Sequence, residues 1–280
     1  MKKKTTCAAL AVLIMALQPS FGATPVTHQQ FQAVHPDGTS SFDDHGPAQV
    51  TIEGILLNCP EEWLDPAAAY TPDFVPWFMG GQWEVFIQGE GDDHAATAVW
   101  IGQNYGNGPG YDNYTDAEWL AHLQRINRDP ATGYVFHPGD RVRITGSYLF
   151  YKGKLNINEN HSTDPALDFH IKLVEPAVGL PRPEPVTLAD LKHSDDRAIF
   201  DPNRMTGCEY HQCRLIRIQD VQIIDPENWG PDSTITITDG AGRTLPVYLA
   251  LGSGFDRHPC PTGTIDVIGI LDQLAPGRPP

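Results

Sequence analysis

The chain has 280 residues, with 19 lysines and arginines against 35 aspartates and glutamates and a net charge of −16. Phosphate neutralisation supplies much of the affinity of proteins for nucleic acid, so this charge excludes DNA and RNA as default partners. The hydrophobic content of 40% is normal for a folded chain. The 26 glycines and 25 prolines favour many short strands joined by turns.

The N-terminus has the charged and apolar order of a secretory signal. Three lysines precede an apolar run over residues 8–17, which is too short to remain in a bilayer as a spanning helix. The small residues Ser20 and Gly22 favour cleavage after Gly22, with cleavage after Ala23 as the alternative. We therefore expect a signal peptide over 1–22, a periplasmic or extracellular mature chain, and no membrane span. Cleavage would shift the net charge from −16 to −19, because it removes three lysines and no acid.

Four cysteines remain after this cleavage, and an even number in an oxidising compartment favours two disulfides. Cys208, Cys213 and Cys260 lie in the C-terminal half, so two of them are expected to pair there. Cys59 would then bridge the two halves or stay free. A zinc site built from Cys208, His211, Cys213 and Cys260 is the alternative, although C-x4-C is not a usual zinc spacing.

The N-terminal half is predicted to be mainly β. Residues 23–47 carry turn formers and predict an extended segment, and a strand follows over 50–57. The proline-rich stretch over 60–81 predicts a long loop, and such loops are usually functional or disordered. The next two strands form a hairpin in which alternate aliphatic side chains face the interior. These four side chains are Val85, Ile87, Val99 and Ile101.

A helix and further strands complete this half. Thr115 and Glu118 have the spacing of a capping box, and the apolar residues that follow have helical spacing. Pro138 and Gly139 predict a turn before a strand that bends at Gly146. Short strands are then expected over 155–158 and 169–174.

A proline-rich linker over 176–187 is expected to separate the halves, and the second half repeats the order of strands. A short helix is predicted over 187–192, and a long strand over 213–224 carries a bulge where the apolar phase slips at Leu215 and Ile216. A hairpin over 234–249 and a last strand over 264–271 follow. Pro261, in the lead-in to this last strand, and Gly269 within it match Pro138 and Gly146 loosely.

Several segments resemble the tandem oligonucleotide/oligosaccharide-binding (OB) folds of exported bacterial proteins. The segments are VTIEGILLN, TAVWIGQNY, HPGDRVRITGSYLFYKGKLNI, PEPVTLADL, CRLIRIQDVQIID and TGTIDVIGILDQ. The resemblance covers most of residues 48–275 and implies a mainly β chain of two small Greek-key barrels, at 48–175 and 188–280. Such barrels often bind ligands on the face of their second and third strands. After Gln273 little room remains for a last strand, so the second barrel is completed by another segment or exposes an edge that invites pairing.

The candidate ligand-binding residues are Phe86, Trp100, Arg143, Tyr148 and Phe150. Phe86 and Trp100 lie opposite the core phase on adjacent strands, where an OB fold offers a stacking surface, and the other three could extend it. Aromatic faces stack on bases and on sugar rings. The alternative is that these side chains pack under the long loop or against the second half.

No metal, cofactor or catalytic residue is indicated. Two clusters of acids and histidines lack the spacing of a known metal loop, and both are expected to be polar loops. Their members are Asp92, Asp93 and His94, and His161, Asp164, Asp168 and His170. No glycine-flanked serine and no plausible pair of cysteine and histidine is present.

These observations predict a non-enzymatic exported binding or interaction protein whose ligand is glycan-like or a protein. One alternative is a metal-dependent hydrolase or nuclease-associated factor that uses the acidic clusters. Another is a structural or assembly role, in which the chain associates through an open edge of the second barrel.

Overall fold

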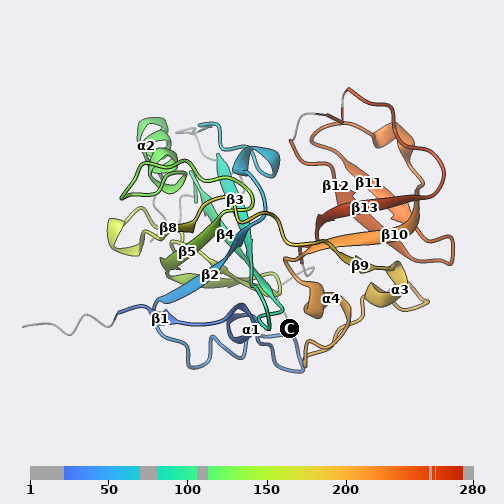
Figure 1. Cartoon of the computed structure of the whole chain (residues 1–280), viewed down its shortest axis with the longest axis horizontal. Coiled ribbons are helices and arrows are strands. Elements are labelled where there is room, and N and C mark those ends of the chain that lie inside the picture. Colours follow the sequence, from blue (N-terminus) through green and yellow to red (C-terminus); the bar gives the residue numbers. More distant parts are fainter. Residues whose placement is uncertain (1–21, 70–80, 106–112, 252–253, 256, 274–280) are drawn as a thin grey trace, which may run out of the picture.

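Figure 1 shows the computed structural model of the chain, in which two β units lie side by side. The structure describes residues 22–69, 81–105, 113–251, 254–255 and 257–273. Nearly all of the expected signal peptide and part of the long loop therefore lie outside the described residues. Among the residues described, no helix is both long and apolar enough to cross a bilayer.

The first unit is an eight-stranded sheet of order β6-β7-β4-β3-β2-β5-β8, with β1 paired beside β2. The strand pairs β1–β2 and β4–β7 are parallel, and the other pairs are antiparallel. The elements of this unit are β1 (Thr24–Pro25), α1 (His28–Phe31), β2 (Val50–Leu56), η1 (Pro60–Glu62), β3 (Gln82–Gln88), β4 (Ala96–Gly102), α2 (Asp116–Ile126), β5 (Arg141–Gly146), β6 (Tyr148–Tyr151), β7 (Lys154–Ile157), η2 (Pro165–Leu167) and β8 (His170–Glu175).

The second unit is a smaller sheet of order β12-β11-β10-β13, with β9 paired in parallel beside β10. Its elements are β9 (Glu184–Val186), α3 (Leu188–Leu191), α4 (Gly207–His211), β10 (Leu215–Ile223), η3 (Pro226–Asn228), β11 (Thr234–Thr238), β12 (Thr244–Tyr248) and β13 (Ile265–Ile270). The bulge predicted at Leu215 and Ile216 lies further along β10. The register with β13 shifts between Ile218 and Val221, where Asp220 has a φ of 55°.

The chain is thus mainly β, as predicted, with two β units of mixed strand direction. The pairing of the described strands closes neither sheet into a barrel. The predicted helix is α2, and its capping box of Thr115 and Glu118 is formed. Two segments expected to be irregular contribute structure of their own. Residues 23–47 contain β1 and α1, and residues 176–187 contain β9, which pairs with β10.

The predicted strand phase of the first unit is confirmed. Val85, Ile87, Val99 and Ile101 are all at most 1% exposed and belong to the core of that unit. Phe86 points to the opposite face, where it packs with Ala96 and Ala98 in a separate cluster. The alternation of side chains across β3 and β4 therefore gives the unit one face toward its own core and one face away from it.

Both units begin with the same motif. The tripeptide Pro-Val-Thr occurs at 25–27 and again at 185–187. In each case the proline lies in a short strand parallel to the long strand of the unit, and the threonine precedes a one-turn helix. The backbone N–H of each threonine donates to the side chain three residues later, Gln30 or Asp190.

The strand registers extend this repeat. Pro25 lies opposite Thr51 of β2, and Pro185 lies opposite Arg217 of β10. The strands β2 and β10 are therefore equivalent in the two units. Both strands lead into a 3-10 turn that ends at a tryptophan, in the sequences CPEEW (59–63) and DPENW (225–229).

The glycines of the last strands also correspond. Gly146 pairs with Val50 and Gly269 pairs with Ile216, the residues just before Thr51 and Arg217. The loose match noticed in the sequence therefore reflects equivalent positions of β5 and β13.

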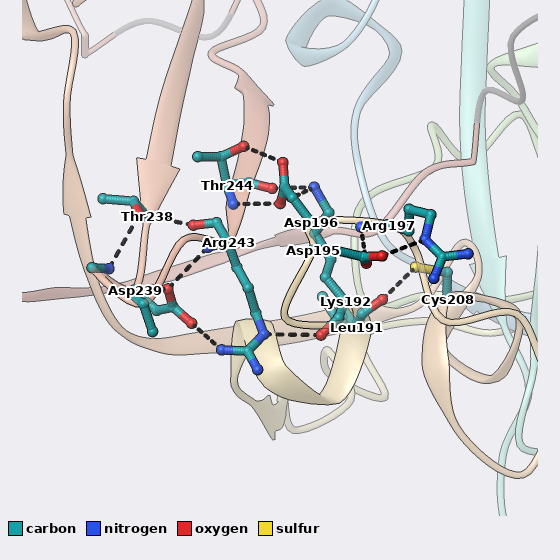
Figure 2. A network of polar contacts seen from close by, with 12 residues as sticks. Leu191, Lys192, Asp195, Asp196, Arg197, Cys208, Thr238, Asp239, Arg243 and Thr244 are labelled. Atoms are coloured by element: carbon teal, nitrogen blue, oxygen red, sulfur yellow. Dashed lines mark hydrogen bonds and ion pairs between the residues drawn. The ribbon is translucent and has the colours of Figure 1, made fainter.

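Polar contacts hold the hairpin of the second unit against the turn after α3 (Figure 2). The Asp196 carboxylate accepts hydrogen bonds from the N–H and hydroxyl of Thr244, at 2.8 and 2.9 Å, and pairs with Lys192 at 2.6 Å. The Arg243 guanidinium donates to the Lys192 carbonyl and to Asp239, both at 2.9 Å. Through the hydrogen bond from Lys192 and those from Thr244, the pKa of Asp196 is lowered to about 2.

We expect the Asp196→Asn substitution to lower the melting temperature at pH 7, because it removes the ion pair and one acceptor of Thr244. A depressed carboxyl pKa stabilises the fold above the unfolded value of about 4. This contribution is lost as the pH falls through the folded value of about 2. The difference between wild type and variant should therefore shrink between those values in thermal scans. Asp195→Asn, which removes only an exposed pair with Arg197, is the control and should change little at pH 7. Equal effects of the two substitutions would refute the anchoring role of Asp196.

Candidate functional site

The outward face of β3 and β4, where the ligand site was expected, is covered by the second unit. Phe86 is fully buried, in a cluster that joins Ala98 with Cys213 and Leu215. Trp63, from the turn after β2, packs edge-on against Phe86 with ring centroids 5.4 Å apart. The alternative of packing against the second half therefore holds for Phe86, which has no surface left for a ligand.

A buried lysine lies in this interface between the units. Lys154 is 3% exposed, and its ammonium contacts the carboxylates of Glu84, at 3.8 Å, and Asp272 of the second unit. The same ammonium lies 5.5 Å from the centroid of the Phe86 ring. Burial raises the pKa of Glu84 to about 7, against the opposing effect of Lys154. The Trp63 indole N–H also donates to the Glu84 carboxylate.

The other predicted binding residues do not gather on one surface. Arg143 is paired with Glu53 at 2.7 Å. Tyr148 packs edge-on against Phe31, with centroids 5.4 Å apart, and Phe150 is partly buried against the core of the first unit. Only Trp100 remains partly exposed on the outward face of the hairpin.

Trp100 belongs to a group of three rings, which we call the aromatic site and define as Trp100, Tyr105 and His161. The Tyr105 and His161 rings are stacked, with centroids 4.9 Å apart and an angle of 11° between their planes. The Trp100 centroid lies 5.7 Å from that of His161 and 6.0 Å from that of Tyr105. Trp100 also covers Gly102, where an added Cβ would come within 3.1 Å of the indole. Burial lowers the pKa of His161, which favours the neutral form of its imidazole.

Amide side chains without partners are found at the strand ends beside this site. Val99 of β4 pairs with Ile157 of the parallel strand β7. The next residues along the chain, Trp100 in β4 and Asn158 after β7, therefore lie side by side. Asn158 is 1% exposed and Asn104 is fully buried. The Oδ1 atom of Asn158 and both polar side-chain atoms of Asn104 have no hydrogen-bond partner within the described parts of the chain. Unpaired buried amides are costly, so such groups are usually satisfied by an ordered water, an ion or a ligand.

A second cluster offers metal ligands. His122, Glu159 and Asp168 each present an atom within 4.8 Å of the others. Arg125 occupies the same place, because its guanidinium lies 3.1 Å from Glu159 and 3.4 Å from Asp168. The Tyr114 hydroxyl donates to Glu159 at 3.0 Å. A divalent cation would have to displace Arg125, whose positive charge already neutralises the carboxylates of Glu159 and Asp168.

The two clusters that the sequence showed are dispersed by the fold. Asp93 accepts hydrogen bonds from the backbone of His28 and Gln29, at 2.8 and 2.9 Å, and so caps α1. His94 instead stacks on Tyr210 of the second unit, with centroids 4.0 Å apart. In the other cluster, Asp168 joins Arg125 while His161 joins the aromatic site.

The structure contains no disulfide among the described cysteines. The thiols of Cys59, Cys208, Cys213 and Cys260 are all free. Cys208 donates to the Leu191 carbonyl, and burial raises the pKa of the Cys213 thiol. Among the described residues, the one group of potential metal ligands is that of His122, Glu159 and Asp168. The expected zinc ligands Cys208, His211, Cys213 and Cys260 are therefore not gathered at one point.

Comparisons with known protein families, with curated proteins and with solved structures found no match to this chain. The function must therefore be argued from the geometry alone. Sequence reasoning found Trp100 by its strand phase, but it missed Tyr105 and Lys154. Tyr105 lies past the end of its strand, and a lysine within an alternating strand gives no signal of burial.

We expect the Lys154→Met substitution to destabilise the protein by about 3–5 kcal/mol, because it leaves the Glu84 and Asp272 carboxylates buried without a cation. The loss should be larger at pH 8 than at pH 5. Glu84 binds a proton in the folded variant but is ionised in the unfolded chain, so stability falls as pH rises through this range. Urea unfolding at the two pH values measures this.

A second substitution is the control for this experiment. Adding Glu84→Gln to Lys154→Met removes one of the unpaired charges and should recover part of the stability. A single Lys154→Met variant within about 0.5 kcal/mol of wild type at both pH values would show that the buried pair contributes nothing.

Proposed function

We propose that this chain is an exported, non-enzymatic binding protein whose ligand is a neutral glycan, taken at the aromatic site. The observation that carries the proposal is the group of Trp100, Tyr105 and His161 beside the unpaired amides of Asn104 and Asn158. Sugar rings present apolar faces that stack on aromatic side chains and hydroxyls that bond to amides. The acidic composition favours a neutral ligand over a polyanion.

We further propose that the two units are OB-like. The order of the first unit supports this, since the strands β2, β3, β4, then helix α2, then β5 follow the order of an OB fold. β5 and β6 adjoin along the chain at Ser147, where β5 pairs with β2 and β6 pairs with β7. The chain at Ser147 thus connects the part of the sheet that contains β2 and β5 with the part that contains β6 and β7. The repeat of Pro-Val-Thr and of the CPEEW and DPENW turns supports a tandem of related units.

A metal-dependent hydrolase is the second candidate, on the observation that His122, Glu159 and Asp168 converge. Arg125 weighs against it, because its cation already satisfies both carboxylates.

Binding of cellohexaose and chitohexaose, measured by calorimetry and tryptophan fluorescence, tests the proposal. We expect one of these neutral probes to bind, and Trp100→Ala to weaken its affinity at least about fivefold, since stacking contributes about 1–3 kcal/mol per ring by analogy with base stacking. Tyr151→Ala is the matched control, because Tyr151 is 46% exposed on β6 and belongs to no part of the site.

Two outcomes would contradict the proposal. In the first, neither probe binds, or Trp100→Ala binds as tightly as wild type. In the second, the purified chain holds a stoichiometric metal ion and cleaves phosphodiesters, which would favour the hydrolase.

A further inference from the structure

The described part of the second unit has fewer paired strands than the first unit. In the first unit, β8 pairs with β5, and β7 pairs with both β6 and β4. In the second unit, β13 corresponds to β5 and pairs only with β10, and β12 corresponds to β4 and pairs only with β11, within the residues that the structure describes. Among the described residues of the second unit, no strand therefore fills the positions that β7 and β8 fill in the first.

The core side chains on these strands differ accordingly. Val142 and Ile144 of β5 are fully buried. Their counterparts by register, Ile265 and Val267 of β13, remain partly exposed. The same holds on the other side, where Leu245 and Val247 of β12 are partly exposed, while the core-facing residues of β4 are fully buried. The second core is thus uncovered on the side that β7 and β8 close in the first.

The two free edges are not equally open to pairing. On β12, the Thr244 N–H already donates to Asp196, and Pro246 has no N–H to offer. Proline and occupied donors are common ways to protect a strand edge. On β13, the neighbouring Leu271 directs both its N–H and its C=O to the segment before β10. Alternate residues point the other way in an antiparallel ladder, so the backbone groups of Ile268 face the free edge.

The edge of β13 is also apolar. Ile268 is 61% exposed, and β13 contains no proline or lysine and only one charge, Asp266. A row of unpaired backbone groups beside an exposed isoleucine is a template for another strand. Residues 274–280, which follow in sequence, include three prolines and are poor donors to such a ladder.

We propose that the free edge of β13 pairs with β13 of a second copy of this chain, which forms a dimer with a continuous sheet. The orientation supports this occupant, because β8 is antiparallel to β5 in the first unit and a two-fold axis relates two copies of β13 in the same way. With the axis perpendicular to the sheet, Ile265 and Val267 of both copies lie on one face and extend the core. The inference does not depend on the proposed glycan site.

Sedimentation equilibrium of the full chain over a range of concentrations tests this dimer. The average mass of the wild type should rise toward twice that of the chain, and added salt should strengthen the association, because both copies are acidic. Ile268→Lys places a charge at the edge and should weaken the dimer at least about tenfold, or by about 1.4 kcal/mol. The side chain is exposed, so the monomer should stay folded.

Leu120→Lys is the matched control, since Leu120 is an apolar residue of α2 that is 50% exposed, far from β13 in sequence. This variant should dimerise like wild type. Amide exchange gives a second measurement, in which the Ile268 N–H becomes protected as the concentration rises. A wild type that stays at the mass of one chain throughout, or equal effects of the two lysine substitutions, would overturn the proposal.

Discussion

A buried charge contact joins the two β units, in addition to the stacking of His94 on Tyr210 and the hydrogen bond from the Leu215 N–H to Gln88. The Lys154 ammonium of the first unit lies between Glu84 of the same unit and Asp272 of the second. Around it, Phe86, Trp63 and Cys213 bury the outward face of the first sheet. A buried cation is costly unless it is paired and hydrogen-bonded, so this contact holds only when both units are in place. It therefore specifies how the units dock as well as stabilising them.

This docking determines where a ligand can bind. An OB-like unit would bind a ligand on the outward face of β3 and β4. The second unit covers the part of this face that contains Phe86. Trp100 lies further along the same face of β4, beyond the contact with Cys213 and Leu215, and so stays partly exposed. Tyr105 and His161 pack against Trp100 there, at the strand ends. Docking thus moves the candidate site from the middle of the sheet to its end.

The internal repeat accounts for both the similarity and the difference of the units. Pro-Val-Thr, the one-turn helix, the long strand and the turn before tryptophan recur in the same order, with matching registers. The first unit continues with β6, β7 and β8, and these strands supply Lys154 and cover its core. In the second unit the described chain has no such strands, which leaves Ile265 and Val267 partly exposed.

Much of the local structure could be predicted from the sequence. Alternation fixed the inward phase of Val85 and Ile87, and the capping box located α2, because both patterns are local. The docking of the two units could not be predicted. The pattern of inward and outward side chains along β3 is the same whether Phe86 on the outward face is exposed or covered by the second unit. The free thiol of Cys213 escaped prediction for a related reason, because cysteine counts say nothing of distances in the fold. Tyr105 and His161 lie in irregular segments, where no period links residues to each other.

We expect the two units to unfold together, because the Lys154 contact joins them. Differential scanning calorimetry of the full chain measures this, with hydrogen exchange of β4 and β11 amides to report on each unit. One transition is expected, with equal calorimetric and van't Hoff enthalpies and with protection of the amides of both units lost at the same temperature. Two separate transitions, one for each unit, would contradict it.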